Sequence, residues 1–102
     1  PKMLPANIYN MVNKLIEMTR SGQVSWSFDY YNDKVSASLP HFSVSILSRF
    51  DSDTGISYLH VDYFDNNNRQ SYRFSTDMYE TQYDTVRVLY DEAQASNLDI
   101  KF

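Results

Sequence analysis

The fold is decided by residues 35–46, VSASLPHFSVSI, in which apolar side chains alternate with serines on either side of a Pro40-His41 corner. A period of two is typical of strands that bury one face of a sheet. Because the corner is short, the two runs are expected to pair as antiparallel neighbours. The stretch therefore predicts two strands that share one apolar face and one serine face.

The same period continues in both directions along the chain. Val24, Trp26 and Phe28 alternate with polar residues, which predicts a strand that precedes these two. Turn-forming residues separate two further predicted strands, over 56–64 and 69–75, with Tyr72 and Phe74 of the last strand facing inward. Five strands joined by short loops predict an antiparallel meander.

A helical period precedes the strands. Asn7 is the expected N-cap of a helix over residues 7–21, and Ser21-Gly22 is the expected stop. At about 100° per residue, one face of this helix carries apolar side chains and Thr19. The members of this face are Leu4, Ile8, Met11, Val12, Leu15, Met18 and Thr19.

A second helical period follows the strands. Residues 78–96 place apolar side chains on one face, and Thr76 or Asp77 is the expected N-cap. The tail over residues 98–102 alternates again, so it is expected to dock as a short strand.

The order of one helix, five strands and one helix predicts the α+β class. We expect a single domain over residues 1–102, built as a two-layer sandwich with both helices on one sheet face. Hydrophobic residues make up 42% of the 102 residues, which is enough for one core. The chain has no cysteine, which excludes a disulfide scaffold and thiol catalysis. The first apolar stretch is too interrupted for a signal or membrane segment, so a cytoplasmic location is expected.

Charge is distributed unevenly along the chain. The formal net charge is −4, and residues 77–102 account for all of it with six acidic and two basic side chains. An acidic balance argues against direct nucleic-acid binding, because phosphate contacts need a basic surface. One ridge of the second helix is predicted to carry Glu80, Asp84, Arg87 and Asp91. This ridge is either a solvated helix face or a surface that recognises a basic partner.

The sheet face opposite the helices is predicted to be rich in serine. In the fourth strand, Leu59, Val61 and Tyr63 are expected to face the core, because the other register would bury polar side chains without partners. The open face then carries Ser25, Ser27, Ser36, Ser38, Ser43, Ser45, Tyr58, His60, Asp62 and Arg73. It is either a solvated face or a docking surface with Tyr58 as an anchor.

Patterns for catalysis and metal binding are weak. No nucleophile motif or phosphate-binding glycine motif occurs, and the histidines are only His41 and His60. Residues 51–55, DSDTG, resemble the start of a calcium loop but lack the third ligand and the distal glutamate. We therefore expect no enzyme activity, no catalytic or metal-binding residues and no cofactor.

Two short elements add a family resemblance. The first is Thr19-x-x-Gly22-x-Val24-x-Trp26, and the second is Leu89-Tyr90-x-x-Ala93. Together they resemble elements of a loose set of small bacterial and phage α+β proteins to which no activity is assigned. In style, the chain is similar to toxin-immunity proteins and phage anti-defence inhibitors. This resemblance implies a role in protein binding.

Three functional hypotheses follow. The first is a non-catalytic inhibitor that blocks a basic surface of a toxin, a nuclease or a defence complex, with Tyr58 or Tyr9 as a secondary anchor. Its predicted partner-binding acids are Glu80, Asp84, Asp91 and Glu92. The second is a sensor that binds a small ligand or nucleotide at His60 and Arg73 on the open sheet face. The third is a structural homodimer formed through the serine face.

Overall fold

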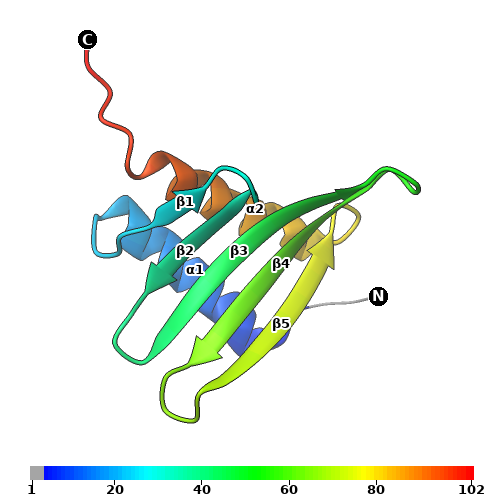
Figure 1. Cartoon of the computed structure of the whole chain (residues 1–102), viewed down its shortest axis with the longest axis horizontal. Coiled ribbons are helices and arrows are strands. Elements are labelled where there is room, and N and C mark those ends of the chain that lie inside the picture. Colours follow the sequence, from blue (N-terminus) through cyan, green and yellow to red (C-terminus); the bar gives the residue numbers. More distant parts are fainter. Residues whose placement is uncertain (1–3) are drawn as a thin grey trace.

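The computed structural model describes residues 4–102, and its element order is the predicted one (Figure 1). Its elements are α1 (Ala6–Arg20), β1 (Ser27–Asp29), β2 (Lys34–Ser38), β3 (Phe42–Asp51), β4 (Ile56–Asp65), β5 (Gln70–Asp77) and α2 (Thr81–Ala95). The five strands form one antiparallel sheet in the order β1-β2-β3-β4-β5. The predicted α+β class and the predicted meander are confirmed.

Both helices cover the same face of the sheet, which gives the predicted two layers (Figure 1). The core between the layers is one cluster, because the apolar stripes of the helices meet the inward residues of the strands. Its fully buried members include Val12, Leu15, Val35, Val44, Ile46, Leu59, Val61, Val86 and Leu89. The register predicted for the fourth strand is therefore correct for Leu59 and Val61.

Helix α1 begins one residue earlier than predicted. Pro5 occupies the N-cap position, and Asn7 lies inside the first turn, where its Oδ1 accepts a hydrogen bond from the Ile8 N–H at 2.9 Å. The predicted stop is correct. Gly22 has a φ of +76°, which a residue with a side chain rarely adopts, and the chain leaves the helix there.

The start of α2 is a correction to the sequence prediction. Thr76 and Asp77 belong to β5, where Asp77 pairs with Tyr58, so neither is the N-cap of the helix. Glu80 holds that position. Asp77 instead closes the turn ahead of the helix, since its Oδ1 accepts the Tyr79 N–H at 2.9 Å and its own N–H donates to Glu80 Oε1 at 3.0 Å.

The link between α1 and the sheet is a chain of buried hydrogen bonds. Trp26, just before β1, is 3% exposed. Its Nε1–H donates to Thr19 Oγ1 at 2.9 Å, and that hydroxyl donates to the Leu15 carbonyl at 2.6 Å. A buried indole needs an acceptor, and Thr19 supplies it from the last turn of α1.

The tail beyond α2 does not form the predicted strand. Asn97 Nδ2 donates to the Trp26 carbonyl, and residues 98–102 then extend away from the domain without a strand partner (Figure 1). The nearest sheet edge is β1, which is only three residues long and offers a short ladder. The apolar side chains of Leu98, Ile100 and Phe102 are exposed.

Candidate functional site

The acidic side chains in the second half of α2 are paired within the chain. Asp91 Oδ1 lies 3.4 Å from Arg87 Nε, and Glu92 Oε2 lies 3.3 Å from Arg20 Nε on α1. Acidic side chains near a helix C-terminus are unfavourable beside the partial negative charge there, and the arginines offset this effect. The acidic side chains in the second half of α2 therefore have their charge compensated within the chain.

The acidic side chains in the first half of α2 have different roles. Glu80 is half-buried, and its Oε1 holds the N–H of Asp77 at 3.0 Å. Asp84 is exposed in the first turn, where the helix dipole favours a carboxylate. Asp84 forms no ion pair with any residue in the range 4–102. Among the predicted acidic residues, Asp84 is the one whose carboxylate faces solvent uncompensated by another described residue.

Exposed apolar side chains gather beside this end of α2. The Met78 N–H donates to the Ser57 carbonyl at 3.0 Å, and Ser57 pairs with Phe50 of β3, so the three residues lie in one row across the sheet end. Phe50, Met78 and Tyr79 are 66%, 44% and 75% exposed. We refer to Phe50, Met78, Tyr79 and Asp84 together as the N-terminal surface of α2.

Sequence reasoning missed the apolar part of this surface. Met78 and Tyr79 were expected inside the second helix, whereas they form the turn before it. Phe50 lies at the end of β3, beyond the part of the sheet that the helices cover. Its signal in the sequence is weak, because an apolar residue at the inward position of a strand usually indicates core.

More carboxylates and the predicted anchor Tyr58 lie at the same end of the sheet. Asp51 ends β3 and Asp53 lies in the β3–β4 loop, where Asp51 Oδ1 accepts the Asp53 N–H at 2.9 Å. Tyr58 pairs with Asp77 across β4 and β5, and its ring stacks on that of His60 with centroids 6.3 Å apart. The second predicted anchor, Tyr9, is held between the helices instead, with its hydroxyl 3.2 Å from Thr85 Oγ1.

The open sheet face has the serine row that the alternation predicts. Ser27, Ser36 and Ser45 are neighbours on β1, β2 and β3, and the row continues through Asp62 and Arg73. The hydroxyl oxygens of Ser36 and Ser45 are 2.9 Å apart, so the serines bond to one another. In this part of the face, polar side chains form hydrogen bonds with one another.

The predicted ligand residues of the open face, His60 and Arg73, are already engaged. Arg73 donates two hydrogen bonds to Asp62, at 2.7 and 2.8 Å, and these bonds raise the pKa of its guanidinium. His60 Nδ1 lies 2.6 Å from Ser75 Oγ. Burial and the nearby charge of Arg73 lower the pKa of His60. A neutral imidazole and a neutralised guanidinium leave little attraction for an anionic ligand.

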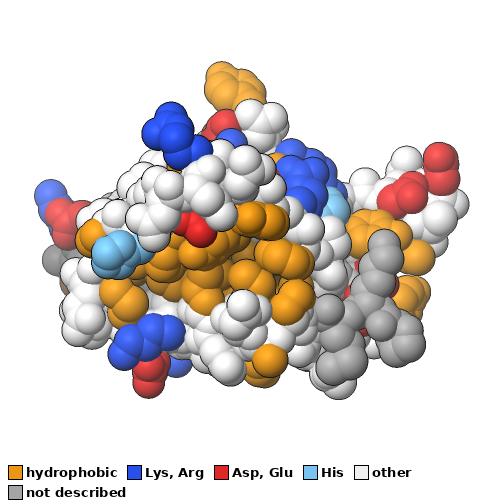
Figure 2. Space-filling model, turned by 90° about the horizontal axis from the view of Figure 1, so that it is seen from below, with side chains coloured by type: hydrophobic (Ala, Val, Ile, Leu, Met, Phe, Trp, Pro, Cys, Tyr) orange, Lys and Arg blue, Asp and Glu red, His pale blue; other side chains and the backbone are white. Residues whose placement is uncertain are grey.

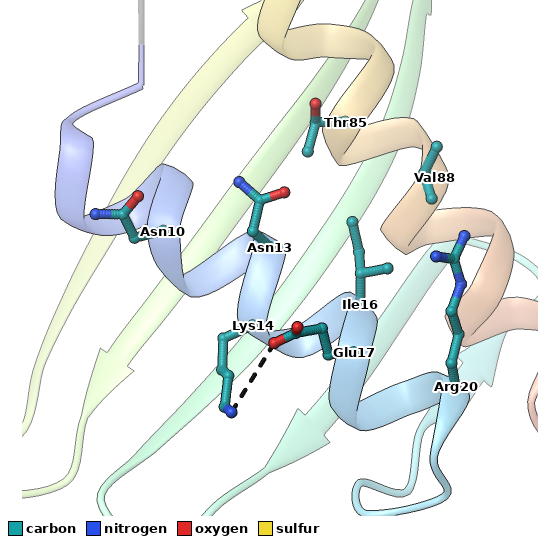
Figure 3. Close-up of a pocket in the computed structure, with 8 residues that line it drawn as sticks. All are labelled: Asn10, Asn13, Lys14, Ile16, Glu17, Arg20, Thr85 and Val88. Carbon is teal, nitrogen blue, oxygen red and sulfur yellow. Dashed lines mark ion pairs between the residues drawn. The ribbon is translucent and has the colours of Figure 1, made fainter.

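A polar groove runs between the outer faces of the two helices (Figure 3). It has a volume of about 630 Å³, and Thr85 and Val88 of α2 face α1 across it. Lys14 and Glu17 on its rim pair with each other at 3.9 Å. Its charged groups do not converge on one point, so the groove has the character of an open helix–helix seam.

A second groove is aromatic and lies between α1 and the far end of the sheet. It has a volume of about 490 Å³, and it belongs to the hydrophobic surface in the middle of Figure 2. Tyr72 faces the helix layer as predicted but is 43% exposed, because α1 leaves this end of the sheet partly uncovered. This aromatic groove is lined by Asn7, Ile8, Met11, Phe42, Tyr63, Asp65, Tyr72 and Phe74.

Three further observations bear on function. Within residues 4–102, no three histidine, aspartate or glutamate side chains are grouped so as to hold a metal ion. Neither α1 nor α2, the helices of the described range, has the length and apolar composition needed to span a membrane. No protein-family model, curated protein or solved structure matches this chain. Function is therefore inferred from the chain's own surfaces.

Proposed function

We propose that this chain is a non-catalytic protein-binding domain that inhibits its partner by covering a basic surface, in the manner of toxin-immunity and phage anti-defence proteins. The observation that carries the proposal is the N-terminal surface of α2. There, Phe50, Met78 and Tyr79 are exposed, and Asp84 places an exposed carboxylate in the first turn of α2. Aromatic and methionine side chains surrounded by charge are typical of protein interfaces.

The apolar and acidic groups of this surface have separate roles in the proposal. Tyr79 and Phe50 supply the apolar area that a partner buries, since both are more than half exposed. The carboxylates of Asp84, Asp51 and Asp53 attract lysine and arginine side chains and speed up the encounter. The partner surface that fits is therefore an apolar pocket bordered by basic residues.

The other predicted acids have smaller roles. Asp91 and Glu92 must exchange Arg87 and Arg20 for a partner's cation, so their net gain is small. Glu80 acts indirectly, because its carboxylate holds the turn that presents Tyr79. Tyr58 lies on the open sheet face at the same end of the sheet, where it offers additional contact area.

The test starts with capture of the partner from the native host at low and high salt, with identification by mass spectrometry. The affinity of the purified pair is then measured for two charge-matched variants. Asp84→Lys combined with Tyr79→Ala is expected to lower affinity about 100-fold, as loss of an interface anchor does. Asp91→Lys carries the same charge reversal on a paired acid and is expected to lower affinity less than about fivefold.

Two outcomes contradict the proposal. One is full affinity of the Asp84→Lys/Tyr79→Ala variant for the captured partner while its circular dichroism spectrum is unchanged. The other is a partner whose activity is the same with and without the bound domain, because an inhibitor must reduce it.

A further inference from the structure

The outer edge of β5 has no strand partner among residues 4–102. This strand has eight residues, contains no proline and pairs with β4 without a bulge. Its one charged side chain before Asp77, that of Arg73, is held by Asp62. Soluble proteins usually protect such an edge with charges, prolines or bulges, or cover it with another segment. Because β5 has no proline or bulge and its one arginine is already paired, we expect another segment to cover its edge.

The aromatic groove runs along the inner side of this edge. Tyr72 and Phe74 of β5 form one wall, and Ile8 and Met11 of α1 form the other. The ring of Tyr63, which also lines the groove, lies 6.4 Å from that of Tyr72. A strand added beside β5 would point every second side chain into this groove.

The tail over residues 98–102 has the matching pattern. Leu98, Ile100 and Phe102 alternate with Asp99 and Lys101, and the three apolar side chains are 66%, 71% and 118% exposed. In an extended segment these three side chains lie on one face. Their spacing equals that of the inward residues along β5.

The tail does not reach the aromatic groove of its own chain. Asn97 is fixed to the Trp26 carbonyl beside β1, and β5 lies four strand spacings away, or about 19 Å. Ile100 is three residues beyond Asn97 and lies at most about 10 Å from it. Leu98 and Ile100 can therefore enter the groove only of another copy.

We propose that residues 98–102 of one copy add to the β5 edge of a second copy as a sixth strand. Leu98, Ile100 and Phe102 then fill the aromatic groove, while main-chain hydrogen bonds cover the edge. The contact joins two different surfaces, so two copies close the assembly by exchanging tails, and otherwise the assembly continues to further copies. The contact uses neither Asp84 nor Tyr79, so it stands or falls independently of the proposed function.

Light scattering tests the assembly with the full chain at about 10 μM to 1 mM, a range that covers weak binding by short segments. The full chain is expected to exceed its monomer mass of 12.0 kDa as concentration rises. Ile100→Asp/Phe102→Asp is expected to stay monomeric. The matched control Asp99→Asn/Lys101→Gln changes the opposite face of the same tail and is expected to associate like the parent chain. A parent chain that stays monomeric overturns the proposal, and so does association that survives the apolar substitutions.

Nuclear magnetic resonance then locates the contact. The ¹⁵N-labelled Ile100→Asp/Phe102→Asp chain, whose own tail no longer competes, is titrated with a peptide of residues 97–102. Amide shifts are expected at Tyr72 and Phe74 on β5 and at Met11 on α1. Shifts confined to Phe28 and its neighbours on β1 would assign the tail to the other sheet edge and overturn the proposal, as would the absence of any shift.

Discussion

The two ends of α2 differ in how their polar groups are used. At the C-terminal end, Glu92 pairs with Arg20 of α1, and Asn97 donates to the Trp26 carbonyl. At the N-terminal end, Tyr79 and Asp84 face solvent. The acidic side chains of this helix look equivalent in the sequence, but pairing divides them into a structural set and an available set. A partner of the proposed kind would gain most from the available set, because no internal contact would be lost on binding.

The C-terminal end of α2 lies beside a chain of buried hydrogen bonds at Trp26. Trp26 is buried between the end of α1 and β1, and its indole N–H donates to Thr19. The same hydroxyl donates to the Leu15 carbonyl. Removing one group of this hydrogen-bond chain leaves another buried polar group without a partner. Substitutions here are therefore expected to lower the free energy of unfolding most.

The largest expected effect follows from Thr19→Ala. The substitution leaves the buried Trp26 N–H without its acceptor, which is expected to lower the free energy of unfolding by about 1–3 kcal/mol. Urea denaturation followed by tryptophan fluorescence measures the change. Thr19→Ser keeps the hydroxyl and is the control, with an expected loss of less than about 1 kcal/mol. Equal stability of the two variants would show that packing, rather than the hydrogen bond, fastens this end.

The next effect separates two acids at the N-terminal end. Glu80→Ala removes the carboxylate that holds the Asp77 N–H, and leaving that half-buried donor without its acceptor costs about 1 kcal/mol. Asp84→Ala removes an exposed carboxylate with no ion pair in the described part of the chain, so its expected cost is less than about 0.5 kcal/mol. Thermal unfolding of both variants measures the difference. If Asp84→Ala were the more destabilising, Asp84 would belong to the structural set.

The sheet and its helix layer follow from the sequence because their periods are strong. Alternation over residues 35–46 assigns the serines to one face and Val44 and Ile46 to the core, as the structure confirms. The stripe of apolar residues on α1 is equally regular, and Val12 and Leu15 are fully buried. Such patterns are reliable predictors because the burial of each apolar side chain in the stripe stabilises the fold.

The ends of the helices and strands are harder to predict from the sequence, because they depend on contacts between residues that are distant in the chain. Thr76 and Asp77 have the side chains of N-caps, but β4 continues alongside them and keeps them in the sheet. Tyr79 then falls in a turn and becomes exposed instead of facing the core. For the candidate site, the positions of the acidic residues along the chain were therefore predictable, whereas the exposure of Met78 and Tyr79 depends on where β5 stops.

A smaller effect tests the compensated end of α2. Arg87 pairs with Asp91 at 3.4 Å, and its guanidinium lies 5.4 Å from the centre of the Tyr90 ring. Arg87→Gln removes both interactions and is expected to cost about 0.5–1 kcal/mol at low salt, and less at high salt. Lys14→Gln is the control, because its pair with Glu17 is 3.9 Å long and well exposed, and its expected cost is close to zero. Denaturant titrations measure both losses of stability. If Arg87→Gln and Lys14→Gln lower stability equally, the Arg87–Asp91 pair contributes no more than an ordinary surface ion pair.

The smallest effect concerns His60, whose ring stacks on that of Tyr58 on the open sheet face. Burial and the nearby positive charges of Arg73 and Arg49 lower its pKa below the ordinary value of about 6.5. The unfolded chain then binds a proton more readily than the folded chain. The stability contributed by neutral His60 is therefore full above about pH 6.5 and is lost as the pH falls through the lowered pKa.

His60→Gln tests this sign, because glutamine cannot titrate. The stability of the parent chain minus that of the variant is expected to be constant from about pH 8 to pH 7 and to decrease toward pH 5. Taking the difference cancels the carboxylates that both chains share. A difference that increases toward pH 5 would mean that Asp62 stabilises a charged imidazole more strongly than burial and the two arginines destabilise it. The open face beside Tyr58 would then carry positive charge at low pH and be a poorer neighbour for a basic partner.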